Sequence, residues 1–493
     1  MNGKAKFFSM LMGSLFGLSM STVVLHTQEV SADVSSYTMG EFTHYPILSS
    51  ATTTVTPMVM INSSNDHQLF YKAYNDFTDL DPSENDGIET TYKHAIDYYG
   101  YFDSYKCYDY DTSDELFEPK SVTSDKYCSG NWSGNFLNWA SMARIDAIRK
   151  ILFGGSRRVD TASKTVLERT YLPNDAHSWA KYYNGSDINK LTPFGSESEI
   201  TLCNTTVAGV NSEVVDTNAN PPLIRVAKGN YSLWASNERW QCRWSEEKGA
   251  DNSNNPAYSG LSAEPSNPSK GSEGLLGGDF IARVQACASG LIGKENCKKY
   301  PSGYYKPRGL LQIYGENDQI HFGMTGGSYT KNKSGGILIK DVGSITDEID
   351  ASDGTFTKVY SGASNNGVSA GDAGGIINAL SLWRIVRYRH SDGTYGTSGT
   401  NSTNCTWGSY TFNDGSCQNW GNPFAEIFLS SLRYFAGESV SSNFLTDDSS
   451  LLSGLNTPST WDCPLDASNY CASLNIINFN ASVISYDSDD LDD

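Results

Sequence analysis

The chain has 493 residues, which at about 100–200 residues per domain suits two to four domains or one domain with large insertions. Aromatic residues reach 12%, which is too many for a disordered chain. The balance of 36 basic against 56 acidic residues gives a net charge of −20. Such a surface repels phosphate backbones, so the composition argues against a nucleic-acid-binding protein.

Residues 1–32 are typical of a secretory signal peptide. Lys4 and Lys6 supply the positive start, residues 7–25 are mostly apolar, and Val30-Ser31-Ala32 gives a small-residue cleavage pattern. The alternative is a membrane anchor, because the apolar stretch is close to spanning length. We expect cleavage, since Ser and Gly interrupt the stretch and no later segment is apolar enough to span a bilayer. The sequence therefore predicts an exported chain with no integral membrane segment after cleavage.

A short apolar run at 58–61 follows a Ser- and Thr-rich surface segment at 33–57 and predicts a buried strand. The loop after it places Asn62, Ser64 and Asp66 at i, i+2 and i+4. In α/β sheets ligands bind at the carboxyl ends of strands, so these oxygens are candidate ligands for Ca²⁺ or Mg²⁺. The alternative is a polar turn that caps the next helix.

A second oxygen-rich loop lies at 75–89. Its candidate metal ligands are the carboxylates of Asp79, Asp81, Asp86 and Glu89. Calcium prefers six to eight oxygen ligands, but the loop is not an EF-hand, since Pro82 stands at the first ligand position. The alternative is a solvated acidic loop. If a divalent ion binds, we expect weak binding here in preference to the strand end, because this loop offers four carboxylates and the other offers one.

The aromatic run from Tyr98 to Tyr110 is the next unusual feature. Tyrosine suits both cores and binding surfaces, because it has an apolar body and a polar tip. Packing in the core is one interpretation, and a face that binds sugar or protein is the other.

Further along the chain, apolar residues at helical spacing predict one amphipathic helix over 136–153, ended by Gly154-Gly155. Two more helices are expected at 372–388 and 423–436. Additional strands are expected at 321–325, 336–339 and 474–479. Strands that alternate with helices favour an α/β fold with these three helices around one sheet.

The ten cysteines form no C-x-x-C pair and have no histidine at zinc-ligand spacing, which argues against a structural zinc site. In an oxidising compartment disulfides are the default, and we expect at least three. Pairing of sequential neighbours gives the following set: Cys107–Cys128, Cys203–Cys242, Cys287–Cys297, Cys405–Cys417 and Cys463–Cys471.

The sequence carries little evidence of an active site. Ser64, Asp66 and His67 lie together, but adjacent residues rarely point at one reacting atom. The sequence has no G-x-S-x-G, H-E-x-x-H or P-loop motif. His177 is expected to be packed or hydrogen-bonded. The sequence therefore predicts a protein that is not an enzyme, with a hydrolase at Ser64 and His67 as a minor alternative.

Several passages together carry a family resemblance. They are Tyr98–Tyr108, Trp132–Ala140, Thr165–Arg169, Asp175–Trp179, Tyr300–Gly303 and Ser485–Asp489. From about residue 58 to its end the chain resembles the N-terminal half of the PilC/PilY family, the tip-associated assembly factors and adhesins of type IV pili in Gram-negative bacteria.

This resemblance implies an exported protein of the periplasm, outer membrane surface and pilus tip, which contacts minor pilins and attaches to host or abiotic surfaces. It also implies a von Willebrand factor type A-like central sheet over 58–493, with a disulfide-bearing insertion at about 160–310. The C-terminal β-propeller of the family is expected to be absent from this chain.

Departures from the family pattern at both candidate sites bear on the metal. Asn62 stands where the type A metal loop begins with Asp, and Ala481 stands where another Asp is expected. The compact D-x-D-G-D-G run of the family is stretched here between Asp79 and Gly87.

The rival function is a secreted carbohydrate-binding protein that uses its Tyr and Trp surfaces, and glycan binding without pilus association would favour it.

Overall fold

The computed structural model describes residues 55–81, 87–206, 220–236, 239–247, 268, 270, 278–360, 367–389, 393–396, 402–403, 405, 413–458, 460–480, 482–487 and 490–491. The expected signal peptide lies outside this described part. Within it, no helix has the length and apolar character needed to cross a bilayer.

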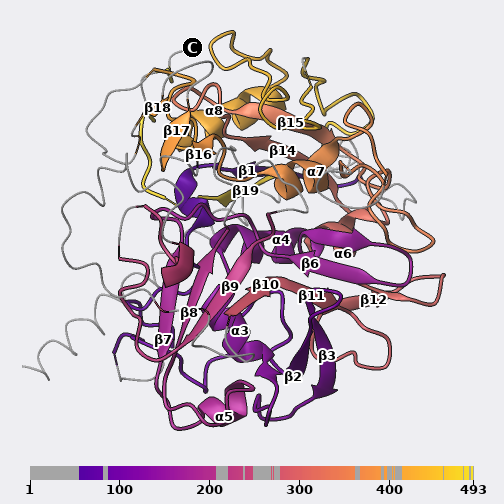
Figure 1. The fold of residues 1–493 in the computed structure, drawn as a ribbon. Helices are drawn as coiled ribbons and strands as arrows, with labels where there is room; N and C mark the ends of the chain where they lie inside the picture. The colour runs from indigo at the N-terminus through magenta and orange to yellow at the C-terminus, as the bar shows by residue number, and fades with distance from the viewer. Residues whose placement is uncertain are drawn as a thin grey trace, which may run out of the picture. The chain divides into compact units, whose positions relative to one another are not determined.

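One sheet gathers strands from both ends of the chain (Figure 1). Strand β1 (Met58–Ser63) lies between β14 (His321–Gly326) and β19 (Leu474–Phe479) and runs parallel to both. Strand β15 (Ile337–Gly343) pairs antiparallel with β14 at the edge. The strands expected from the four apolar runs are therefore confirmed, and they share one sheet.

The predicted helix over 136–153 is wrong in one respect, because it is two helices. Helix α3 (Gly134–Ser141) and helix α4 (Arg144–Phe153) are separated by Met142, whose backbone is extended. The break has a tertiary cause: Ala73 donates its N–H to the Met142 carbonyl at 2.8 Å, and Arg144 donates to the Tyr71 carbonyl at 3.0 Å. These two hydrogen bonds take the place of backbone hydrogen bonds that a continuous helix would form here.

The two later helices are α7 (Gly375–Leu382) and α8 (Phe424–Phe435). Helix α8 agrees with its expected range. Helix α7 is shorter than the expected 372–388, because Trp383 takes up an extended conformation and ends it.

Both faces of the inner strand β1 are buried, whereas the edge strand β19 is mostly exposed. Successive side chains of β1 point to opposite faces, so Met58 and Met60 pack with Tyr434 of α8, whereas Val59 and Ile61 join a core that includes residues of α4 and α7. A parallel strand buried on both sides is expected to be continuously apolar, which explains the run at 58–61.

A six-stranded sheet has the order β4-β2-β3-β11-β6-β5, and a four-stranded sheet the order β10-β9-β8-β7. Their strands are β2 (Lys106–Asp111), β3 (Leu116–Val122), β4 (Trp132–Ser133), β5 (Arg157–Asp160), β6 (Thr165–Glu168), β7 (Trp179–Tyr183), β8 (Ile200–Thr205), β9 (Leu223–Lys228), β10 (Gly278–Ile281) and β11 (Arg283–Ala286). The remaining elements are η1 (His67–Phe70), α5 (Ile188–Leu191), η2 (Ser245–Glu247), β12 (Cys297–Lys299), β13 (Tyr305–Pro307), α6 (Leu310–Gly315), β16 (Tyr388–Arg389), β17 (Thr394–Gly396) and β18 (Ser402–Thr403). The protein is thus a mixed α/β fold with several sheets and few helices.

Four disulfides are formed, and all four join sequential cysteines as expected: Cys107–Cys128, Cys203–Cys242, Cys287–Cys297 and Cys405–Cys417. The fifth expected pair is wrong, because Cys463 and Cys471 are exposed free thiols. The thiol of Cys463 donates instead to the carbonyl of Leu465 at 3.4 Å. Nearness in sequence does not fix the direction of a side chain.

Candidate functional site

The acidic loop is closed at its base by a short antiparallel bridge. Thr78 and Glu89 pair there, and the Glu89 N–H donates to the Thr78 carbonyl at 3.1 Å. Gly87 has a φ of +93°, a conformation that favours glycine over other residues. The chain therefore returns on itself between positions 79 and 89.

This return brings three of the four predicted carboxylates together. Asp79, Asp81 and Glu89 each place one carboxylate oxygen within 4.8 Å of the others. Glu89 is only 1% exposed, and its Oε2 accepts the N–H of Leu80. Its Oε1 is buried and has no hydrogen-bond partner in the described part of the chain. The fourth predicted ligand, Asp86, lies outside the described residues.

Because a buried carboxylate oxygen without a partner is costly, the Glu89 oxygen has capacity for a cation. Three carboxylates at this spacing suit a hard ion that takes oxygen ligands. Glu89 is buried and Asp79 is exposed, so the cluster reaches from the protein interior to the surface.

The strand-end site is arranged differently. Asn62, Ser64 and Asp66 follow one another at the carboxyl end of β1, and all three are buried. The Asn62 Oδ1 accepts hydrogen bonds from the hydroxyls of Thr325 and Ser431, both at 2.6 Å. Its oxygen therefore ties β1 to β14 and to α8.

Asp66 is the single carboxylate among these three residues. It accepts the N–H of Gln68 at 2.9 Å and caps the η1 helix, as the alternative interpretation of the loop predicted. Burial raises the pKa of Asp66 to about 6, so the ionised form is disfavoured in the folded protein. Ala481, which stands where another Asp is expected, lies outside the described residues.

Two histidines meet beside this site, which the sequence pattern did not reveal. The His67 Nδ1 lies 3.2 Å from the His177 Nε2, and the His177 Nδ1 lies 2.7 Å from the Asp175 Oδ1. The hydroxyl of Tyr395 donates to the other oxygen of Asp175. The ring of Trp420 stacks on His67 with centroids 5.0 Å apart. His177 is hydrogen-bonded and buried, as predicted.

The surroundings of His67 favour its neutral imidazole form. Burial, and then the neighbouring His177, lower the pKa of His67 to about 3. The Ser64 hydroxyl makes no hydrogen bond to any described residue, so it is not paired with His67 as a nucleophile is with its base.

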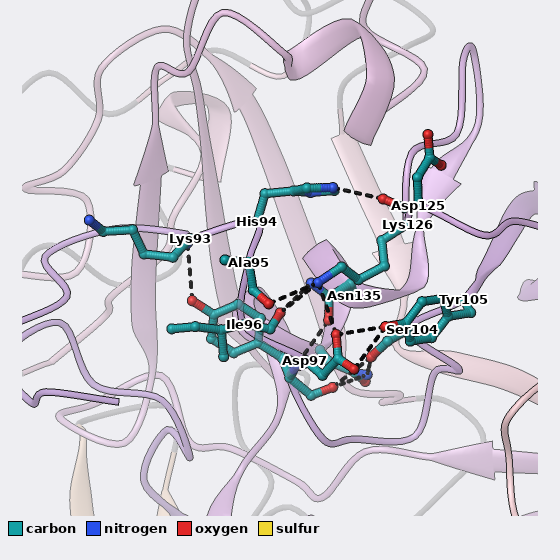
Figure 2. A network of polar contacts seen from close by, with 12 residues as sticks. Lys93, His94, Ala95, Ile96, Asp97, Ser104, Tyr105, Asp125, Lys126 and Asn135 are labelled. Atoms are coloured by element: carbon teal, nitrogen blue, oxygen red, sulfur yellow. Dashed lines mark hydrogen bonds and ion pairs between the residues drawn. The ribbon is translucent and has the colours of Figure 1, made fainter. Parts of the chain in front are cut away.

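The segment before the tyrosine run is fixed by a polar network (Figure 2). The ammonium group of Lys126 donates to the carbonyls of Ala95 and Ile96 at 3.1 and 3.4 Å and to the Asp97 carboxylate at 2.9 Å. Asn135 on α3 donates to the Ile96 carbonyl at 2.9 Å. Backbone groups that would be unpaired in a loop are thereby satisfied.

Most of the tyrosine run packs in the core, as the first interpretation predicted. Tyr98, Tyr101, Phe102 and Tyr108 are 3% exposed or less. Tyr99, in contrast, is 44% exposed. The run therefore serves the core, and Tyr99 remains accessible at the surface.

Comparison with known proteins identifies two family domains. Residues 89–227 match the model described as "PilY1 homolog, small alpha/beta domain", and residues 322–493 match "PilY1 homolog, second domain". The second match spans β1's neighbours β14 and β19, and the first spans strands β2 to β9.

Two similar relatives from Xylella fastidiosa (strain Temecula1) are both described as "Type IV pilus biogenesis factor PilY1 homolog". One is 36% identical over 394 residues, which cover 77% of this chain and 24% of the relative. The other is 29% identical over 238 residues, 46% of this chain and 17% of the relative. The chain thus matches about a quarter or less of each relative's length. No solved structure matches significantly.

Proposed function

Because the chain belongs to the family of PilY1 homologues, we propose that it is a type IV pilus biogenesis factor that acts by protein–protein contact and not by catalysis. The observation that carries this proposal is the presence of both family domains in one chain. The relatives' description as pilus biogenesis factors supports it.

The finer proposal is a location at the pilus tip, with minor pilins as partners and a host or abiotic surface as the target of attachment. Four disulfides support export, because such bonds persist in oxidising compartments such as the periplasm and cell surface. The tip location and the adhesion rest on the family resemblance.

For the fold, we propose that the sheet β15-β14-β1-β19 corresponds to the central sheet of a von Willebrand factor type A-like domain, with an insertion at about residues 160–310. Support comes from the parallel pairing of β14, β1 and β19 and from the burial of both faces of β1. In such sheets, binding groups collect at the carboxyl ends of the strands, where Asn62, Ser64 and Asp66 lie.

For the metal, we propose weak binding of Ca²⁺ at the loop of Asp79, Asp81 and Glu89. The support is the convergence of three carboxylates and the unpartnered buried oxygen of Glu89. The strand-end residues supply a single carboxylate whose oxygen already caps a helix, so they are the weaker candidate.

A clean deletion of the gene tests the pilus proposal. We expect fewer surface pili by electron microscopy and weaker attachment, both restored by the gene supplied in trans and not by an empty vector. Normal piliation and attachment in the deletion strain would refute it.

A pull-down from the sheared surface fraction tests the tip location separately. We expect minor pilins to co-purify with the tagged protein. Loss of piliation without this co-purification would support a role in assembly and refute the tip location.

A further inference from the structure

A cavity of about 230 Å³ lies beneath the exposed part of the tyrosine run. Its wall comes from residues 97–105, from Lys150 near the end of α4, from residues 294–296 and from Pro307 and Arg308. It is smaller than the ~300–1,000 Å³ typical of pockets for drug-sized ligands, so it suits one small ring.

The acidic groups of this wall are already paired within the protein. Asp97 accepts a hydrogen bond from Lys126 at 2.9 Å (Figure 2), and Glu295 forms an ion pair with Lys106. Asp103 accepts the backbone N–H groups of residues 294 and 295 at 2.7 and 3.1 Å. Their negative charge is therefore largely taken up by the protein itself.

The cationic groups of the wall are not paired in this way. The Lys150 ammonium donates to the Gly100 carbonyl and lies 4.8 Å from the centre of the Tyr99 ring. Lys294 lies 3.3 Å from the centre of the Tyr105 ring. Among the described residues, no carboxylate lies within ion-pair distance of the Lys150 or Lys294 ammonium.

Arg308 adds a third positive charge, and its Nε donates to the Asn296 side chain at 2.9 Å and to no described carboxylate. Three cations without an ion-pair partner among the described residues thus line the cavity, beside the paired carboxylates of Asp97, Asp103 and Glu295. Burial is the main cause that lowers the pKa of Lys150 to about 8, and the nearby Asp103 carboxylate opposes it only in part.

We propose that this cavity binds a carboxylate-bearing sugar, of the size of one hexuronic acid unit, with Lys150 as the main partner of the carboxylate. Ammonium groups donate strong hydrogen bonds to carboxylates. The rest of the wall includes Tyr99, Tyr105, Leu167 and Pro307, and these apolar surfaces suit the C–H face of a pyranose ring better than a bare inorganic anion. This site goes beyond the pilus role and does not depend on it.

Isothermal titration calorimetry with glucuronate on the purified protein tests the proposal. We expect a Kd on the order of 1 mM and roughly tenfold weaker binding by Lys150→Gln, because one charge-assisted hydrogen bond is lost. Glucose, which lacks the carboxylate, is expected to bind at least about tenfold more weakly than glucuronate.

The matched control is Lys120→Gln, which removes an exposed lysine outside the cavity and should leave the affinity unchanged. If Lys150→Gln fails to fold by circular dichroism, Lys294→Gln replaces it, since that side chain is exposed and should weaken binding about threefold.

Three results would overturn the proposal: no binding of glucuronate, equal binding of glucose, or displacement of glucuronate by an equal concentration of inorganic phosphate. Unchanged affinity in the lysine variant tested would also overturn it. Titration with an oligomer of uronic acid beside the monomer distinguishes two sources of the ligand. Tighter binding of the oligomer indicates that the ligand is part of a polysaccharide, and equal binding indicates the free acid.

Discussion

Replacing Asp79 and Asp81 together by asparagine is expected to remove most of the stabilisation that calcium gives the folded protein. The three carboxylates of this loop, with Glu89, lie within 4.8 Å of one another, so each pair repels by ~0.9 kcal/mol at the dielectric constant of water and by ~3.5 kcal/mol at an effective value of 20. Without metal, the double variant should therefore be at least as stable as the wild type.

With calcium the order should change, because binding to the folded state alone stabilises it. For a weak site with a Kd of ~10⁻⁴–10⁻³ M, about 10 mM Ca²⁺ raises the free energy of unfolding by ~1.4–2.7 kcal/mol. The wild type should gain this amount, and the double variant should gain little. Thermal unfolding in chelator and in calcium, together with calorimetric titration, measures both effects.

A matched control removes two exposed carboxylates elsewhere. Asp109→Asn/Asp114→Asn changes the net charge equally at exposed side chains, and its response to calcium should equal that of the wild type. The reasoning is refuted if calcium stabilises Asp79→Asn/Asp81→Asn as much as the wild type. If Asp66→Ala instead abolishes the heat of binding, the metal belongs to the strand-end site.

Three further outcomes are expected. Because burial raises the pKa of Asp66 from 3.8 to about 6, its contribution to stability is fully present only below pH 3.8 and is lost as the pH rises through 6. In chelator, Asp66→Asn should thus gain about 2 kcal/mol relative to the wild type between pH 4 and pH 7 in denaturant titrations, and a constant difference would contradict this. Gly100→Ala places a Cβ 2.2 Å from the Asn138 Oδ1, so the free energy of unfolding in urea is expected to fall by ~1–3 kcal/mol. A variant as stable as the wild type would show that α3 can shift to make room for the Cβ at little cost. Cys203→Ala/Cys242→Ala removes a link across 39 residues and should cost ~2–5 kcal/mol by the same assay; an unchanged midpoint would indicate that packing alone holds this region.

The strands of the central sheet and most disulfides were predictable from the sequence. A parallel strand buried on both faces needs an uninterrupted apolar run, so 58–61 was identifiable as a strand without knowledge of its partners. Strand 474–479 lies at the edge of the sheet, and its partly exposed side chains explain why two asparagines interrupt its apolar residues. Sequential pairing likewise predicted four disulfides, such as Cys107–Cys128, although it failed for Cys463 and Cys471. The acidic loop was equally visible, because its carboxylates lie close in sequence and a local turn suffices to gather them.

Tertiary structure alone decided the features that join distant segments. Residues 71–73 break the predicted helix at Met142, and no pattern within 136–153 signals it. His67 meets His177 across 110 positions, and the Asn62 oxygen is engaged by hydroxyls from two other elements. That Lys150 forms no ion pair with a described carboxylate likewise depends on the fold, because the acidic side chains around it form their hydrogen bonds and ion pairs with other residues. Local sequence specifies periodicity and turns, whereas the packing of sheets and helices determines which distant side chains meet.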